Sequence, residues 1–343
     1  MTHATTLSGR LARAALALAG TAALVAGVLV PIGGAETAAE AATDLKGTLV
    51  LDPGTYNKTT KKYSGTIFRM LQPGGTDRYL VNADSSAPDK TYQLLKPGTD
   101  GGLQLGRYQR VPSKPFDANL NSLAKRITQP QKFFGTYWSP NTAPTDAQSG
   151  LPTPAPSLKL SGNKLTGDFS AWTPGWNGIY FNQGSPKPGD DKYPGYTSPL
   201  SGTYNKSTHK FKIRWRSLIV GGPFNNFTGE WTLEGVLADN TIGLKTAKKS
   251  VSVKRGKTAK VKATASNWTE KNLKKTKISI SAPKNLRLKK KTASVSATKR
   301  GANKTVNLKL SVGKKAKKGK HKVQLIWKAG GKSISRTVTV RVR

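Results

Sequence analysis

Five acidic residues in the middle of the chain carry chemistry that could act on a glycosidic bond: Asp168, Asp190, Asp191, Glu230 and Glu234. Glycoside hydrolysis needs two carboxyl groups about 5–10 Å apart, one on each side of the bond. On a single strand Glu230 and Glu234 would face the same side about 13 Å apart, which is too far. Asp190 and Asp191 follow a glycine in a turn-rich segment and are expected to face water. We therefore interpret these acids as structural and name no catalytic residue.

Nucleophilic catalysis and metal binding have fewer candidates still. Apart from His3, the histidines are His209, in a predicted turn, and His321, in a lysine-rich segment, and neither lies near a Gly-x-Ser-x-Gly sequence. The absence of cysteine excludes thiol catalysis, disulfides and cysteine-based metal sites. The segment around Asp190 lacks the spacing of a calcium loop. We expect no metal site and no cofactor.

Aromatic residues are the first positive signal. Five of the seven tryptophans precede residue 242. Exposed aromatic rings can stack on sugar rings, whereas buried ones fill a core. Trp215 and Trp231 lie in predicted strands and are expected in the core, but Trp172 and Trp176 flank a Thr-Pro-Gly sequence that predicts an exposed turn. The glycan-binding candidates are therefore Trp138, Trp172, Trp176 and Tyr180.

Positive charge is the second signal. The chain has 57 Lys and Arg against 17 Asp and Glu, a net charge of +40. Residues 245–343 hold 32 of these basic residues and one acid, Glu270, and 26 of the 32 are lysine. Lysine is a hydrated point charge that attracts polyanions without reading base edges, so we expect no specific nucleic-acid partner. The polyanion-binding candidates are the densest cluster: Lys314, Lys315, Lys317, Lys318, Lys320 and Lys322.

The N-terminal segment predicts export. Arg10 and Arg13 precede an apolar stretch at residues 14–30, and a small-residue cleavage sequence follows at Ala39-Glu40-Ala41. This order is typical of a cleaved secretory signal peptide, here residues 1–41. No second apolar stretch follows, so we expect no membrane span after cleavage. The protein is predicted to be secreted, and to be extracellular or bound noncovalently to the cell wall.

The elements that must position these residues are predicted to be strands. In residues 243–343 apolar residues alternate with polar ones, as in Val306-Asn-Leu308-Lys-Leu310-Ser-Val312, which is typical of half-buried strands. About seven such strands predict a small β-sandwich with lysines facing outward. Within the same region, apolar and polar residues also alternate at residues 251–253, 261–263, 278–280, 323–325 and 338–342.

Residues 42–242 predict a second β domain, a sandwich or barrel rich in Gly, Pro and aromatics. The only plausible helix is residues 117–127, with Asp117 as its N-cap, and residues 139–156 predict a loop or linker. Residues 54–63 and 202–211 are similar in sequence and predict either two like hairpins or two duplicated halves. The fold class is thus all-β, with a signal peptide at 1–41 and domains at 42–242 and 243–343.

The C-terminal residues also resemble a known family. Val253 with Arg255-Gly256-Lys257, then Ile278 to Pro283, and then Gly319 to Val323 occur in an order similar to the immunoglobulin-like module that accompanies α-galactosidases and other secreted carbohydrate enzymes. The resemblance implies a spacer or accessory module, although the lysine load departs from it. Residues 158–236, above all 218–235, resemble a module of secreted bacterial proteins of unassigned function, which implies export and a β-rich fold.

These observations lead to one hypothesis and two alternatives. The hypothesis is a secreted, noncatalytic protein of the cell envelope. Its C-terminal domain would attach electrostatically to anionic cell-wall polymer or another extracellular polyanion, and its first domain would present a face that binds polysaccharide or protein. The first alternative is a secreted carbohydrate-active enzyme whose catalytic acids lie among residues 168–234. The second is an inert structural or adhesin-like surface protein.

Overall fold

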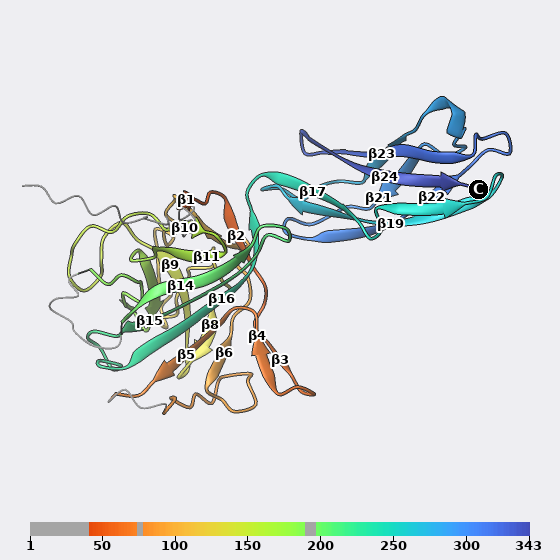
Figure 1. Ribbon diagram of the computed structural model, residues 1–343. Coiled ribbons are helices and arrows are strands. Elements are labelled where there is room, and N and C mark those ends of the chain that lie inside the picture. Colours follow the sequence, from red (N-terminus) through yellow and green to blue (C-terminus); the bar gives the residue numbers. More distant parts are fainter. Residues whose placement is uncertain (1–40, 74–77, 189–196) are drawn as a thin grey trace, which may run out of the picture. The chain divides into compact units, whose positions relative to one another are not determined.

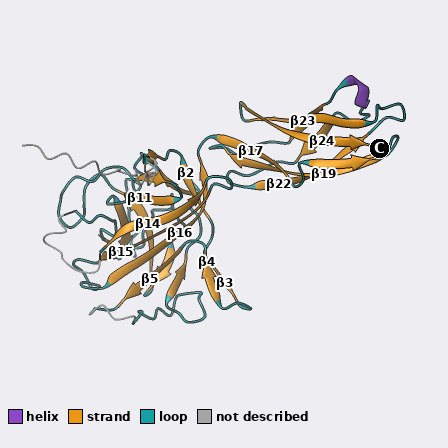
Figure 2. Ribbon diagram, viewed as in Figure 1, coloured by secondary structure: helices purple, strands orange, loops and turns teal. Residues whose placement is uncertain are grey.

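The computed structural model describes residues 41–73, 78–188 and 197–343, and these form strands, turns and loops with one short 3-10 helix, Lys284–Leu286 (Figure 2). The predicted all-β class is confirmed. Among the described residues no helix is long and apolar enough to span a membrane. The predicted signal peptide lies outside the described residues except for Ala41, and so do Asp190 and Asp191.

The first β region, residues 41–238, is organised around a ten-stranded antiparallel sheet (Figure 1). Its order is β1-β10-β11-β14-β15-β16-β2-β7, and β5 and β6 extend it from a second part of β16. The strands are β1 (Thr43–Asp44), β2 (Thr48–Leu51), β5 (Ile67–Leu71), β6 (Tyr92–Leu94), β7 (Gly102–Gln104), β10 (Ser157–Ser161), β11 (Lys164–Asp168), β14 (Ser198–Asn205), β15 (Lys210–Leu218) and β16 (Thr228–Ala238).

A four-stranded sheet and a separate hairpin complete this region. The smaller sheet has the order β13-β12-β9-β8. Its strands are β8 (Gln131–Phe133), β9 (Thr136–Thr142), β12 (Trp172–Trp176) and β13 (Ile179–Tyr180), and the hairpin is β3 (Thr55–Asn57) with β4 (Lys62–Ser64). The prediction of a loop or linker at residues 139–156 is therefore wrong at its start, because Ser139 to Thr142 pair with β12.

The core of the first region is aromatic. The rings of Trp215 and Trp231 stack with centroids 5.8 Å apart, and Trp172 meets both edge-on at 5.5 and 5.1 Å. Edge-to-face and offset stacking are the favoured arrangements of aromatic pairs. All three indoles are at most 2% exposed, so the predicted core positions of Trp215 and Trp231 are confirmed.

The predicted helix at residues 117–127 is wrong. The Asp117 carboxylate accepts hydrogen bonds from the backbone N–H groups of Asn119 and Asn121, at 2.8 and 2.9 Å, and Leu120 has a left-handed φ of 61°. Asp side chains that bond the backbone two to four residues ahead stabilise turns in competition with helix. The same interaction that suggested an N-cap therefore closes a turn.

The two similar segments form like hairpins, as predicted. Asn57 Oδ1 accepts the backbone N–H groups of Thr59 and Thr60, and Asn205 Oδ1 accepts those of Ser207 and Thr208, all at 2.9–3.0 Å. The hairpins lie at different places in the fold, since one is the separate pair β3–β4 and the other joins β14 to β15. The repeat therefore reflects shared turn chemistry.

The C-terminal sandwich, residues 241–343, has two sheets, with orders β17-β19-β22 and β18-β24-β23-β20-β21. Only β18 and β24 pair in parallel among its strands. The strands are β17 (Thr241–Thr246), β18 (Ser250–Val253), β19 (Thr258–Trp268), β20 (Thr276–Ser281), β21 (Thr292–Val295), β22 (Asn303–Ser311), β23 (Gly319–Ala329) and β24 (Lys332–Val342). Every segment predicted from alternation lies in a strand, except that Val312 follows the end of β22.

The core of the sandwich is aliphatic and separate from the first. Val, Leu, Ile and Ala side chains fill it around a single tryptophan, Trp327, which is fully buried. In β22 the apolar residues Val306, Leu308 and Leu310 point inward while the intervening residues are exposed, as a period of two requires. The lysines are therefore left on the outer faces and in the loops.

Candidate functional site

Three loops of the sandwich bring twelve cations to one end, which we call the basic loop end. This end carries the last residues of β24, and the loops precede β19, β21 and β23 (Figure 1). All twelve side chains are exposed. They are Lys254, Arg255 and Lys257 in the first loop, Lys284, Arg287, Lys289, Lys290 and Lys291 in the second, and Lys314, Lys315, Lys317 and Lys318 in the third.

Backbone hydrogen bonds hold these loops side by side. The N–H of Val312 donates to the carbonyl of Lys257 at 2.9 Å, and the N–H of Lys317 donates to the carbonyl of Asn285 at 3.1 Å. The N–H of Lys289 donates to the carbonyl of Ser311 at 3.0 Å. Each of the three loops is thus tied to another by its main chain, which leaves the lysine side chains free to project.

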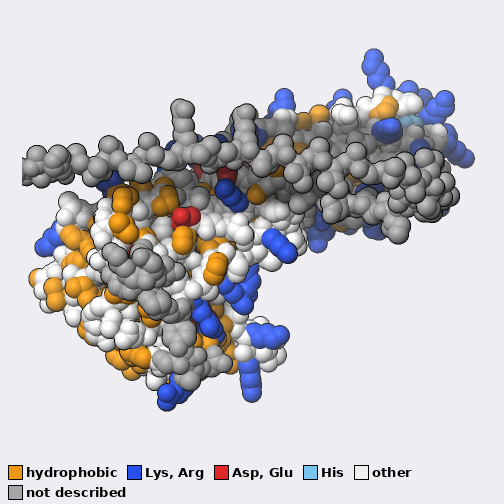
Figure 3. Space-filling model, turned by 60° about the vertical axis from the view of Figure 1, so that its left-hand side comes forward, with side chains coloured by type: hydrophobic (Ala, Val, Ile, Leu, Met, Phe, Trp, Pro, Cys, Tyr) orange, Lys and Arg blue, Asp and Glu red, His pale blue; other side chains and the backbone are white. Residues whose placement is uncertain are grey.

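The charge of the sandwich is almost uncompensated. Its one acid, Glu270, lies beyond the opposite end of β19, 3.5 Å from Arg300. Like charges also lie directly opposite each other across strands, Lys260 against Lys309 and Lys320 against Arg341. Such pairs are destabilising, and a large net charge opposes the compact state. In Figure 3 Lys and Arg side chains project from this region.

The structure places the six predicted lysines together. Four lie in the third loop, and Lys320 and Lys322 follow on β23 with exposed side chains. Between them His321 is buried, and its Nε2 lies 2.8 Å from the carbonyl of Lys317. The other two loops were missed because they lie 20 to 60 residues earlier, and only the pairing of β19 with β22 and of β20 with β23 shows that they meet.

The four aromatic candidates do not form one exposed surface. Trp138 and Trp172 are 4% and 0% exposed, so their rings have no free face. The expected exposed turn at Thr173-Pro174-Gly175 is wrong, because these residues are part of β12 and pair with β9. Burial against Trp215 and Trp231 draws Trp172 inward, which the local sequence does not show.

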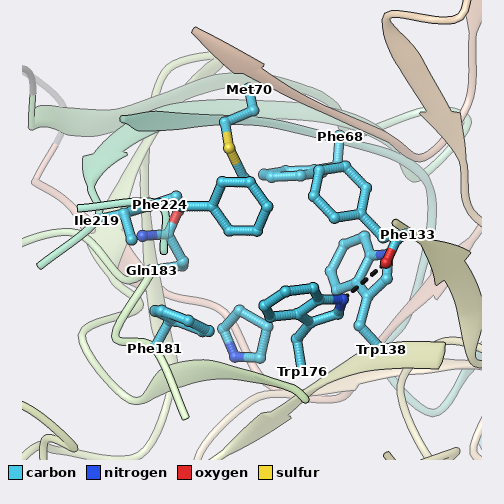
Figure 4. A pocket seen from close by; sticks show the side chains of 10 residues that line it. Phe68, Met70, Phe133, Trp138, Trp176, Phe181, Gln183, Ile219 and Phe224 are labelled. Carbon is cyan, nitrogen blue, oxygen red and sulfur yellow. Dashed lines mark hydrogen bonds between the residues drawn. The ribbon is translucent and has the colours of Figure 1, made fainter. Parts of the chain in front are cut away.

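Trp176 and Tyr180 are half-buried and remain candidates. The Trp176 Nε1–H donates to the carbonyl of Phe133 at 2.7 Å, and the Tyr180 ring packs on Phe116 at 5.2 Å. Burial raises the pKa of the Tyr180 hydroxyl. Trp138 and Trp176 both line an apolar pocket in which Gln183 is the polar residue (Figure 4).

The size of this pocket argues against a preformed sugar site. Its free space is about 40 Å³. A water molecule occupies about 30 Å³ of liquid, and small-molecule sites usually offer about 300–1,000 Å³. A sugar ring therefore does not fit in this pocket unless lining side chains move. The assignment of a glycan to the four predicted residues stays a prediction.

Of the five acids named from the sequence, the three that the structure describes have structural partners. Glu230 Oε1 accepts a hydrogen bond from Arg69 at 2.5 Å and its Oε2 accepts bonds from Arg216. Glu234 lies 2.5 Å from Lys212 and accepts the backbone N–H of Gly65. The remaining acid, Asp168, accepts the backbone N–H and hydroxyl of Ser170 in a turn.

The protonation of Glu230 follows from these contacts. Burial pushes its pKa up, but the hydrogen bonds and charge of Arg69, followed by those of Arg216, outweigh burial and hold the pKa below the usual value. A general acid needs the opposite shift. Within the described part of the chain, no group of three or more His, Asp or Glu could hold a metal ion.

Comparison with known proteins agrees with the C-terminal resemblance. Residues 253–328 match the family model of the NPCBM-associated NEW3 domain of alpha-galactosidase. A comparison with curated proteins found no match to the chain. Over these residues the sandwich is therefore similar to the NEW3 domain, a module of a kind associated with carbohydrate enzymes. The resemblance of residues 158–236 to an unassigned module and the domain boundary at 242/243 stay predictions.

Proposed function

We propose that this is a secreted, noncatalytic, cell-envelope-associated binding protein whose sandwich attaches electrostatically to anionic wall polymer. The first region presents a face for glycan or protein in this proposal. The observation that carries it is the basic loop end, where twelve exposed cations meet and the one acid of the sandwich lies at the other end. A polyanion that screens these charges offsets their mutual repulsion.

Lysine predominance supports a polymer ligand over a single small anion. Ten of the twelve cations are lysines, on three loops rather than in one cavity. Lysine presents a mobile point charge, which suits a flexible chain of repeated negative charges. Each lysine close to an anionic surface contributes about 1 kcal/mol at moderate ionic strength, so several weak contacts add up to firm attachment.

The test is cosedimentation of the full chain with isolated cell walls, before and after removal of their anionic polymer, across a salt series. We expect binding that needs the polymer and is lost by half-molar salt, where the screening length falls to about 4 Å. Replacing Lys314, Lys315, Lys317 and Lys318 by Gln should weaken binding about tenfold or more.

A matched variant separates a localised site from diffuse charge. Replacing Lys245, Lys260, Lys262 and Lys309 by Gln removes the same charge from the outer face of the three-stranded sheet, where all four are exposed. We expect this variant to bind nearly as well as the unaltered chain. Equal loss in the two variants, or binding that persists in half-molar salt, would contradict the proposal.

A further inference from the structure

The outer face of the large sheet carries a groove that the sequence did not suggest. It has a volume of about 500 Å³ and is lined from β5, β6, β14, β15 and β16. Pairing places Arg69, Glu230, Arg216 and Ser198 in one row across four strands. A second row, two residues along, contains Ile67, Thr232, Arg214 and Ser201.

Arg69 is held rigidly at one side of the groove. Its guanidinium lies 3.6 Å from the centroid of the Tyr79 ring and 4.8 Å from that of Tyr92. Its Nη1 also donates to the Tyr92 hydroxyl at 2.9 Å, and its Nε donates to Glu230. Tyr92 in turn stacks on Tyr63 at 3.8 Å. This arginine is therefore fixed by rings and hydrogen bonds on several sides.

Glu230 compensates only part of the positive charge. It lies between Arg69 and Arg216, and each of its oxygens accepts from one guanidinium. Arg214 lies in the second row, about 7 Å further along β15. It is exposed, and among the described residues it has no hydrogen-bond or ion-pair partner. The groove thus holds three guanidinium groups and one carboxylate.

The chemistry of the lining points to one ligand class. Guanidinium groups present paired donors that match a planar carboxylate, and all three cations here are arginine, whereas the sandwich has mostly lysine. The hydroxyls of Ser198, Ser201 and Thr232 can bond to sugar hydroxyls, and the Ile67 side chain offers an apolar surface for ring carbons. The volume falls within the usual range for small-molecule sites.

We propose that this groove binds a saccharide that bears carboxylates, with Arg214 contacting a carboxylate of the ligand directly. This inference rests on the proposed function, in which the first region presents a glycan-binding face. It adds the class of ligand and the residues that contact it. Arg69 and Glu230 are positioning residues that keep the groove open and charged. Arg214 is free to meet the ligand because no described residue pairs with it.

The test uses calorimetric titration of the full chain with trigalacturonate. The four lysines of the third loop are replaced by Gln, so that the basic loop end does not dominate the heat. We expect saturable binding that Arg214→Gln weakens about tenfold or more, as for loss of a charged hydrogen bond, with Arg214→Lys intermediate. Lys164→Gln, an exposed lysine on β11, is the charge-matched control and should change affinity less than twofold.

Two further probes identify the ligand class. Fully methyl-esterified trigalacturonate should not bind, and a glycerol phosphate oligomer of equal charge should bind at least tenfold more weakly. Equal binding of the phosphate oligomer, no binding of trigalacturonate, or equal loss in Arg214→Gln and Lys164→Gln would overturn the inference. Arg214→Gln in the otherwise unaltered chain should still sediment with walls, so failure here leaves the basic loop end separately testable.

Discussion

The two β regions differ in whether their charged side chains have partners of opposite charge. In the first region acids lie between or beside cations, as Glu230 does between Arg69 and Arg216 and Glu234 does beside Lys212. In the sandwich there is one acid for 32 basic residues, and Lys260 lies opposite Lys309 across two strands. In the first region many of the charges are paired within the protein, so its surface can select a small ligand by shape. In the sandwich most of the charges have no partner of opposite charge within the sandwich and need counterions or a polyanion from solution.

Their cores differ as well. The first region packs tryptophans and phenylalanines against one another, and the sandwich packs aliphatic side chains around Trp327. The difference teaches that a long alternation of small apolar residues suffices for a regular sandwich. A fold with short strands and many turns relies on a few large side chains. The predictions below test this contrast, beginning with the largest effect.

Removal of one core ring should affect one region only. Trp231 is fully buried and contacts Phe68, Trp138, Trp172 and Trp215. We expect Trp231→Ala to lower the free energy of unfolding of the first region by about 3–5 kcal/mol. Calorimetry should show its transition move down while that of the sandwich stays in place, and Trp231→Phe should shift it less. A matching shift of both transitions would show that the cores do not act separately.

Loss of the central carboxylate should destabilise the first region in a pH-dependent way. The pKa of Glu230 is lower when folded than its ordinary value, so its contribution is present above about pH 4.3 and is lost as the pH falls through the folded pKa. We expect Glu230→Gln to cost about 1–2 kcal/mol at pH 7, and the cost to shrink below pH 4.

The matched control for this prediction is Glu270→Gln in the sandwich. The Glu270 side chain is 37% exposed and its Arg300 contact is 3.5 Å long, so its loss should cost less than about 0.5 kcal/mol. Urea unfolding at several pH values measures both. A cost of Glu230→Gln that is the same at pH 3 and pH 7 would mean that charge is not its cause.

The smallest expected effect is the change in unfolding free energy when one exposed lysine is replaced, and its sign should differ between the two regions. Lys260 lies opposite Lys309, so Lys260→Gln should stabilise the sandwich by about 0.3 kcal/mol at low salt. Lys159 lies opposite Asp44, so Lys159→Gln should slightly destabilise the first region. Urea midpoints at low salt and in half-molar salt measure this, and both effects should fade as salt screens the charges. Two shifts of the same sign would contradict the contrast.

The sequence predicted the sandwich well and the first region partly. The alternation of apolar and polar residues, as from Val306 to Val312, is a local pattern that does not depend on contacts with distant residues. The strands of the sandwich could therefore be predicted from it. The prediction of a helix at residues 117–127 is wrong because the Asp117 side chain can cap a helix or close a turn equally well. The prediction that Trp172 lies at an exposed turn is wrong because its burial depends on Trp215 and Trp231, which lie 43 and 59 residues later.

The candidate sites were predicted least well, because both depend on register. Six lysines of the third loop and β23 were found as a run, but the loops that join them were not. Arg69, Arg214 and Glu230 come from three strands and meet only because β16 pairs with β5 on one side and β15 on the other. No spacing within one segment reveals such a row.

The parallel pairing of β18 with β24 affects how the sandwich folds. β18 ends at Val253, and its partner residues on β24 are made almost 90 residues later. The edge formed by β18 can find its neighbour only once Thr339 to Val342 have been synthesised. Contacts this distant along the chain slow folding. At a synthesis rate of about 5–20 residues per second, β18 therefore has no partner strand for at least several seconds.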